Sequence, residues 1–168
     1  IGYGYLRTPG KHAPILIEKN ALGDGVPNSQ LRVSPQHRLL ISSPIAQRMF
    51  GKREILLPAI RLIGLNGIHQ TNTHDPVRYW HILMKRHHLI CANGAWAETL
   101  FLGKNALEAL SADARAEIEA ILPLLSKNDA SKLARFEPPA NAQKRLAHRH
   151  MVNSKPLVDG ICQSQSTR

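Results

Sequence analysis

Between Ile1 and Gly103 the apolar residues come in short groups rich in Ile, Leu and Val, separated by Gly, Pro and Asn. Groups of this length between turn-forming residues are typical of β-strands. The groups are Ala13–Ile17, Leu31–Val33, Arg38–Ile41, Glu54–Leu57, Val77–Leu83 and His88–Cys91. The pattern therefore predicts a mainly β fold of short strands from Ile1 to about Gly103.

Turn signals separate these groups at Gly23–Pro27, Asn66–Gly67 and Asn93–Gly94. The Asn-Gly pairs suit tight turns, because both central residues of a type I′ turn need a positive φ. We therefore expect the segment Tyr79–Leu100 to form a β-hairpin, with a strand, a basic turn, a second strand and then the second Asn-Gly turn.

After Gly103 the apolar residues recur with a helical period. Ser111 fits an N-cap, and Asp113 would lie in the first turn of the helix that it begins. The residues of the apolar stripe are Ala114, Ile118, Ile121, Leu122 and Leu125. We expect a helix between about Ala106 and Leu125, inside a helical extension that spans residues 104–135.

The last part of the chain, residues 136–168, is polar and basic. Pro138-Pro139 interrupts regular structure, and the chain closes on Gln163–Arg168, so we expect a basic, flexible tail. A length of 168 residues suits one core. The predicted organisation is thus a β domain over residues 1–103 followed by the helical extension and the tail.

Lys and Arg number 22 against 12 Asp and Glu, a formal net charge of +10. Such a balance concerns partners rather than fold, and a nucleic acid is one partner that it would suit. The basic residues are scattered and the aromatic content is 5%, which makes a nucleic-acid-binding domain the less favoured alternative. The two cysteines form no Cys-x-x-Cys pair and predict no zinc site. Cys91 is expected to be buried and structural, and Cys162 to lie in the tail.

No apolar run reaches the length of about 20 residues that spans a bilayer, so no membrane partner is predicted. The first residue is Ile and no charged leader precedes an apolar stretch. We therefore expect the chain to belong to a longer protein whose signal, if it has one, lies upstream. A secreted or cell-surface location with that protein is compatible with the sequence, which leaves the location and the oligomeric state open.

Ser34 and His37 lie three positions apart between two strand-like groups. A turn that presents both could hold a scissile amide, since the histidine can donate a proton to a leaving nitrogen and the hydroxyl can bind the backbone. The spacing alone is common, and a histidine at a strand entry is often a hydrogen-bonded structural residue.

The segment V-S-P-Q-H-R at Val33–Arg38 is followed by a hairpin of the form Y-x-H-x-L-x-x-R-H-x-x-x-x-A-N-G-x-x-A-E-[ST]. This ordered set resembles the bacterial Hint family, which is related to inteins and Hedgehog autoprocessing domains. Asn20–Gly23, Pro27 and Glu54–Ala59 fit the same family, and the Ala/Leu/Glu-rich stretch after Gly103 resembles its helical extension. The resemblance covers about Ile1 to Leu125 and implies a Hint-type β fold.

The resemblance also implies roles for individual residues. His37 matches the histidine that assists the acyl shift at the upstream cleavage junction, and Ser34 stands where Thr is usual. His87 matches the hairpin histidine, although His88 could take its place after a slip of one residue. Neighbouring strand residues point to opposite faces, so register separates these two. The predicted catalytic residues are therefore His37, Ser34 and either His87 or His88.

Two departures from the family pattern limit the predicted chemistry. The attacking Cys or Ser lies at the start of the family's domain, and neither Gly2 nor Tyr3 can attack. Inteins end in a His-Asn pair, whereas this chain has Glu98-Thr99 after the Asn-Gly turn. We expect no splicing, and N-terminal self-cleavage only in a longer parent that supplies the nucleophile and is itself the substrate.

Alternatives to self-processing remain open at this point. A non-catalytic Hint-like scaffold or interaction domain would need no nucleophile. Five histidines within twenty residues could suggest a metal, but their spacing matches no zinc motif and we predict neither a metal nor a cofactor. These histidines are His69, His74, His81, His87 and His88.

Overall fold

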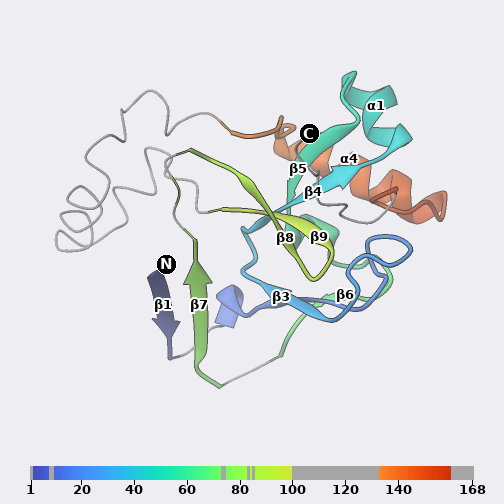
Figure 1. The fold of residues 1–168 in the computed structure, drawn as a ribbon. Helices are drawn as coiled ribbons and strands as arrows, with labels where there is room; N and C mark the ends of the chain where they lie inside the picture. The colour runs from blue at the N-terminus through green and yellow to red at the C-terminus, as the bar shows by residue number, and fades with distance from the viewer. Residues whose placement is uncertain are drawn as a thin grey trace.

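The structure, a computed structural model, describes residues 2–7, 10–72, 75–82, 84, 86–99 and 133–159. Strands dominate this part of the chain, as the sequence predicted (Figure 1). The elements are β1 (Gly2–Leu6), η1 (Gly10–His12), β2 (Ile15–Ile17), β3 (Leu31–Val33), β4 (Arg38–Ser42), α1 (Pro44–Phe50), β5 (Glu54–Pro58), η2 (Ala59–Leu62), β6 (Ile68–Gln70), β7 (Val77–His81), β8 (Leu89–Ala92), β9 (Ala95–Glu98) and α4 (Ala140–Val152). The prediction of a mainly β fold is therefore confirmed.

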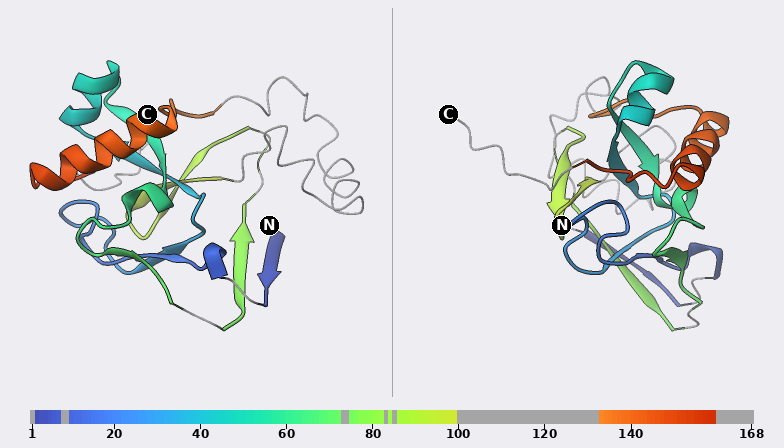
Figure 2. Two further views of the ribbon diagram at one scale, coloured as in Figure 1. Left: turned by 180° about the vertical axis from the view of Figure 1, so that it is seen from behind. Right: turned by 90° about the vertical axis from the view of Figure 1, so that its right-hand side faces the viewer.

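Strand pairing in the described residues is antiparallel and gives sheets with the orders β5-β4-β9-β8, β3-β2-β6 and β1-β7. The β1-β7 ribbon lies at the end of the molecule away from α1 and α4 (Figures 1 and 2). In the four-stranded sheet, Leu39 of β4 pairs with Ala97 of β9. This pairing brings the first residue of β4, Arg38, close to the last residue of β9, Glu98.

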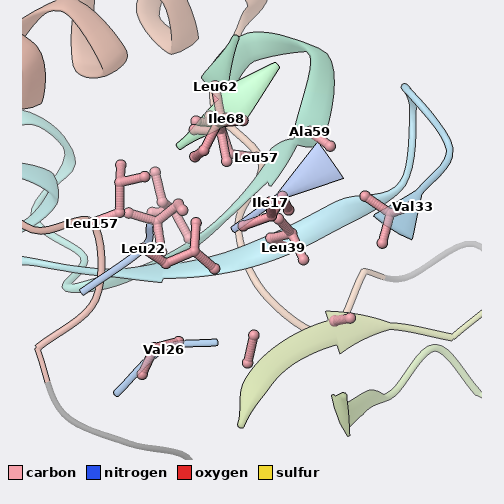
Figure 3. Close-up of a cluster of buried hydrophobic side chains, with 14 of the residues drawn as sticks. Ile17, Leu22, Val26, Val33, Leu39, Leu57, Ala59, Leu62, Ile68 and Leu157 are labelled. Carbon is pink, nitrogen blue, oxygen red and sulfur yellow. The ribbon is translucent and has the colours of Figure 1, made fainter. Parts of the chain in front are cut away.

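The core is built from continuous apolar runs in β2, β4 and β5, whose central side chains are buried. Figure 3 shows Ile17, Leu39 and Leu57 converging from these three strands. Leu157, far along the chain, packs into the same cluster. Burying one such side chain stabilises the fold by about 1.5–3 kcal/mol, so the C-terminal region contributes to the stability of the β domain.

Helix α1 was not predicted, although its boundary signals are present in the sequence. The Ser43 side chain caps it by accepting a hydrogen bond from the Ala46 N–H at 3.1 Å. Pro44 occupies the first turn, and Gly51 ends the helix in the left-handed region at φ 65°. Both are preferred residues at these positions, because proline lacks the N–H that the first turn leaves unpaired and glycine has no Cβ to clash.

The expectation of a flexible tail was wrong for residues 140–159. Helix α4 buries Ala142, Gln143, Leu146 and His150 along one face and packs against α1 (Figure 2). Beyond it, the N–H groups of Leu157 and Val158 both donate to the carbonyl of Leu22, at 2.8 and 2.9 Å. The stripe of α4 contains a single strongly apolar residue, Leu146, which is why the pattern of the sequence did not reveal the helix.

Gly23 shows how closely the C-terminal region is fitted to the β domain. A Cβ atom at this position would collide with the carbonyl of Val158. The predicted helix between Ala106 and Leu125, and most of the predicted extension, lie outside the described residues. The domain boundaries stay a prediction.

The hairpin expected within Tyr79–Leu100 was wrong in its pairing, because in the described structure β7 pairs with β1 and β8 pairs with β9. The Asn93-Gly94 turn is confirmed, with φ of 51° and 81° at the two residues, and it joins β8 to β9. Cys91 was expected to be buried and is exposed, because no residue of β8 is buried, whereas β5, the other edge strand of the sheet, lies in the core. Cys162 lies outside the described residues. Among the described helices, none is long and apolar enough to span a membrane.

Candidate functional site

The turn at Ser34–His37 carries the first candidate histidine. It closes with a hydrogen bond from the His37 N–H to the Ser34 carbonyl at 3.0 Å, and Pro35 stands at its second position, where a fixed φ suits a β-turn. Two amides next to η2 hold it in place: Ile60 N–H donates to the Pro35 carbonyl and Ala59 N–H to the His37 carbonyl, both at 2.9 Å. His37 is therefore fixed at the entry to β4, where its side chain is half-buried.

The Glu98 carboxylate is the centre of the site. It is 6% exposed, and its Oε1 accepts the Arg38 backbone N–H at 2.8 Å. Its Oε2 accepts from the Arg38 guanidinium at 3.1 Å and from His87 Nε2 at 3.0 Å. One carboxylate thus joins the start of β4, the end of β9 and His87, which lies two residues before β8.

The charge of Glu98 follows from these contacts. Burial, the largest single influence, raises the pKa of the Glu98 carboxyl. The hydrogen bond from His87, the charge and backbone N–H of Arg38 and the charge of His37 lower it, and the net pKa lies below the ordinary value. Glu98 is therefore ionised at neutral pH, and the charge of His37 is close enough to act on it.

His87 is held in a single tautomer. Its side chain is 1% exposed, and its Nδ1 accepts a hydrogen bond from the Ala134 backbone N–H at 2.8 Å. A backbone N–H can only donate, so Nδ1 carries the lone pair and the proton resides on Nε2. His87 therefore donates to Glu98 through Nε2 as a neutral imidazole.

Arg38 links this centre to the C-terminal region. Its guanidinium Nη1 contacts Glu98, while its Nε donates to Glu137 Oε2 at 2.8 Å. The guanidinium is 22% exposed, so two carboxylates share one partly buried cation. A planar, permanently charged guanidinium suits this role because its N–H groups point in fixed directions toward different acceptors.

His88 lies outside this network in the described structure. Its side chain is exposed, and its backbone pairs with Thr99 through the Thr99 N–H and the Thr99 hydroxyl, both at 2.9 Å. Of the two neighbouring histidines, His87 is thus the one against the Glu98 carboxylate. This settles where their side chains lie, while their chemical role stays a prediction.

A family model described as Hint domain matches residues 3–104. The chain belongs to the Hint domain family. No curated protein and no solved structure matches it. Within this Hint domain, the match includes Ser34, His37, His87 and Glu98, whereas Ala134 and Glu137 lie beyond it.

Two parts of the Hint site were missed by sequence reasoning. Glu98 was noted as a motif residue without a role, although it ends β9 after the buried Ala95 and Ala97, where a carboxylate needs a partner. The contributions of Ala134 and Glu137 could not be found from the sequence. Ala134 contributes only its backbone N–H, which no residue type marks. Ser34 is on the same turn as His37, which fits the predicted pairing of the two.

The structure describes the side chains of three of the five clustered histidines, His69, His87 and His88. His69 is exposed on β6, and His74 lies outside the described residues. Among the residues that the structure describes, no three His, Cys, Asp or Glu side chains come together as metal ligands would.

Proposed function

We propose that this Hint domain drives the self-processing of a larger bacterial protein by an N-terminal acyl shift. The observation that carries the proposal is the buried Glu98 carboxylate, which binds His87 at 3.0 Å and whose pKa is lowered in part by the charge of His37. These residues come from separate motifs, and a shared ionised partner is what a site for proton transfer requires. In this proposal, residues upstream of Ile1 supply the attacking Cys or Ser.

The proposed step is a nucleophilic displacement within one chain. The sulfur or oxygen of the upstream nucleophile loses its proton to solvent water and bonds to the carbonyl carbon of the preceding peptide. The carbon–nitrogen bond then breaks, and the nitrogen takes a proton from the imidazolium of His37. The products are a thioester or ester and a free α-amino group, and water or another nucleophile can then release the upstream segment.

His37 is the proposed proton donor for this step. An amide nitrogen is a poor leaving group until it is protonated, and imidazole is the side chain that changes its charge near neutral pH. The ionised Glu98 favours the charged form of a nearby imidazole, so it would keep His37 ready to donate. Ser34, on the same turn, would hold the scissile backbone by a hydrogen bond.

In this mechanism His87 is a positioning residue rather than a proton donor to the substrate. Both of its ring nitrogens have partners inside the protein, at 2.8 and 3.0 Å. It supports Glu98, and the charge of His37 acts on the pKa of Glu98. His88, with an exposed side chain, has no part in the proposed chemistry.

The second candidate function is a non-catalytic Hint scaffold. One observation favours it: His87 and Glu98 are already satisfied by protein partners, as in a structural polar cluster. The two proposals differ in one outcome, since a scaffold does not cut its own chain.

The test uses a chain extended upstream of Ile1 with its natural sequence, here called the extended chain. Cleavage is followed by intact mass and on gels with added thiol. His37→Ala and His37→Gln should each slow cleavage by about 10²- to 10⁴-fold while circular dichroism shows a folded protein, because a positioned general acid is worth that much. Ser34→Ala should slow it less, since the proton donor remains.

Residues 1–168 alone should keep their mass over the same time course. A folded His37→Ala extended chain that cleaves at the wild-type rate would remove His37 from the mechanism. An extended chain that does not cleave at all would favour the scaffold.

A further inference from the structure

Residues 133–139, here called the C-terminal strap, lie outside the family match and run beside β5 (Figure 1). Phe136 forms a parallel bridge with Ile55, and its carbonyl accepts the Leu56 N–H at 2.8 Å. Arg135 adds a salt bridge to Glu54 at 2.6 Å. The strap is thus attached to the edge of the four-stranded sheet that carries the site.

Two groups of the strap reach the site itself. The Ala134 N–H binds Nδ1 of His87 at 2.8 Å, and the Glu137 carboxylate binds Nε of Arg38 at 2.8 Å. These two contacts are made with His87 and Arg38, the two residues whose side chains bind Glu98. The strap therefore closes a chain of contacts from Ala134 through His87, Glu98 and Arg38 to Glu137.

The far end of the strap is anchored as well. Gln143 of α4 is buried and its amide donates to the Pro138 carbonyl at 2.8 Å and to Glu137 at 3.3 Å. Its carbonyl oxygen accepts from Arg61 of η2 at 3.1 Å. Since η2 also holds the Ser34–His37 turn, α4 fixes the strap to the same element that fixes His37.

From this arrangement we infer that the C-terminal strap is a working part of the Hint site, which sets the tautomer of His87 and the orientation of Arg38. Without the Ala134 N–H, Nδ1 of His87 could carry the proton, and Nε2 would then face the Glu98 carboxylate with a lone pair. Two acceptors facing each other repel, so Glu98 would lose one of its donors. Ala134 and Glu137 are therefore positioning residues that act through His87 and Arg38.

The consequence for the reaction rests on the proposed function. Glu98 can act on His37 only while its own position is fixed, and the strap fixes both of its side-chain partners. Displacement of the strap should loosen the carboxylate and slow proton delivery. A small misplacement of a catalytic group can slow a reaction by about 100-fold.

The first experiment tests the tautomer in the full 168-residue chain and needs no cleavage. Long-range ¹H–¹⁵N spectra should show His87 protonated on Nε2, with a scalar coupling through the hydrogen bond between the Ala134 nitrogen and Nδ1. Ala134→Pro removes the N–H and should abolish the coupling and shift the ring signals, whereas Ala134→Gly keeps the N–H and should retain both. A wild-type His87 protonated on Nδ1 would overturn the inference. This measurement on the wild-type chain can be made even if Ala134→Pro fails to fold.

The second experiment measures cleavage in the extended chain. Ala134→Pro should slow it by up to about 100-fold relative to Ala134→Gly, and Glu137→Gln should slow it by a smaller factor. Equal rates for folded Ala134→Pro and Ala134→Gly would overturn the inference. A wild-type extended chain that does not cleave would overturn the proposed function but not the inference about the strap. The spectra would still decide whether the strap sets the tautomer of His87.

Discussion

Two buried histidines of this protein, His87 within the Hint match and His150 beyond it, have opposite surroundings. His87 lies between a carboxylate and the Ala134 backbone N–H. His150 lies between the Ser43 hydroxyl, at 3.1 Å from Nε2, and the Lys155 carbonyl, at 3.1 Å from Nδ1. A carbonyl only accepts, so the proton of His150 resides on Nδ1, and the two rings adopt opposite tautomers.

The neutral partners of His150 suit a structural role. Ser43 Oγ already accepts the Ala46 N–H, so its own hydrogen can go to His150 Nε2. The pair joins the start of α1 to α4 and to the loop after it. Burial, the largest influence, lowers the pKa of His150 below its ordinary value of 6.5, although the carbonyls of Lys155 and Pro156 and the charge of Asp159 raise it.

The comparison shows which feature separates a site from a fold contact. Both rings are buried and both bind a backbone group from the C-terminal region. The ring of His87, however, is next to an ionised carboxylate that also acts on a second histidine, His37. The hydrogen-bond partners of the His150 ring are neutral, and the charge of Asp159 is the smallest of the influences on its pKa.

The largest expected effect on stability is that of Glu98→Ala. The change removes one acceptor from three buried or half-buried donors, and breaking a buried pair in this way costs about 3 kcal/mol or more of unfolding free energy. Urea unfolding at neutral pH measures the loss. The control is Glu54→Ala, whose salt bridge with Arg135 is nearly half-exposed and should be worth less than about 1 kcal/mol. Equal losses in the two variants would show that Glu98 is not a buried centre.

The next effect separates the adjacent histidines. His87→Ala leaves the Ala134 N–H and the Glu98 carboxylate each short of a partner, and an unsatisfied buried group costs about 1–3 kcal/mol. His88→Ala removes an exposed side chain and should change the unfolding free energy by no more than about 0.5 kcal/mol. The same denaturation curves report both, and a reversed order would mean that the hairpin has the other register.

The smallest expected effect is the pH response of His150. Its folded-state pKa is lowered, so below pH 6.5 the unfolded chain binds more protons and stability falls as the pH falls toward the folded-state pKa. One group of this kind can contribute at most about 1.4 kcal/mol per pH unit. Between about pH 7.5 and about pH 5.5, the unfolding free energy should therefore fall less in His150→Gln than in wild type. His148→Gln, on the exposed face of α4, should keep the wild-type loss, and an unchanged loss in His150→Gln would contradict the assignment.

Much of the β architecture could be predicted from the sequence because its strands are local patterns. The runs at Arg38–Ile41 and Glu54–Leu57 became β4 and β5, and Asn93-Gly94 formed its turn. The stripe of α4 escaped notice because Gln143 and His150 occupy buried positions that are usually apolar. Their burial depends on hydrogen bonds to distant residues, and no local pattern shows these.

In the candidate site, too, local motifs could be found from the sequence and contacts between distant residues could not. His37 and His87 could be named from family motifs, but the carboxylate between them required the pairing of β4 with β9. The choice between His87 and His88 required the register of the hairpin, since a shift of one residue would exchange their faces. The Ala134 N–H could not be predicted at all, because every residue except proline has one.

The central claim is that the Glu98 centre serves the reaction while the Ser43–His150 pair serves the fold. The most direct measurement is the single-turnover cleavage rate of the folded extended chain with Glu98→Gln, compared with that of Ser43→Ala. We predict that Glu98→Gln slows cleavage at least about tenfold, because it removes the charge that acts on His37, and that Ser43→Ala leaves the rate of the folded protein unchanged. Equal rates for the two folded variants would contradict the account.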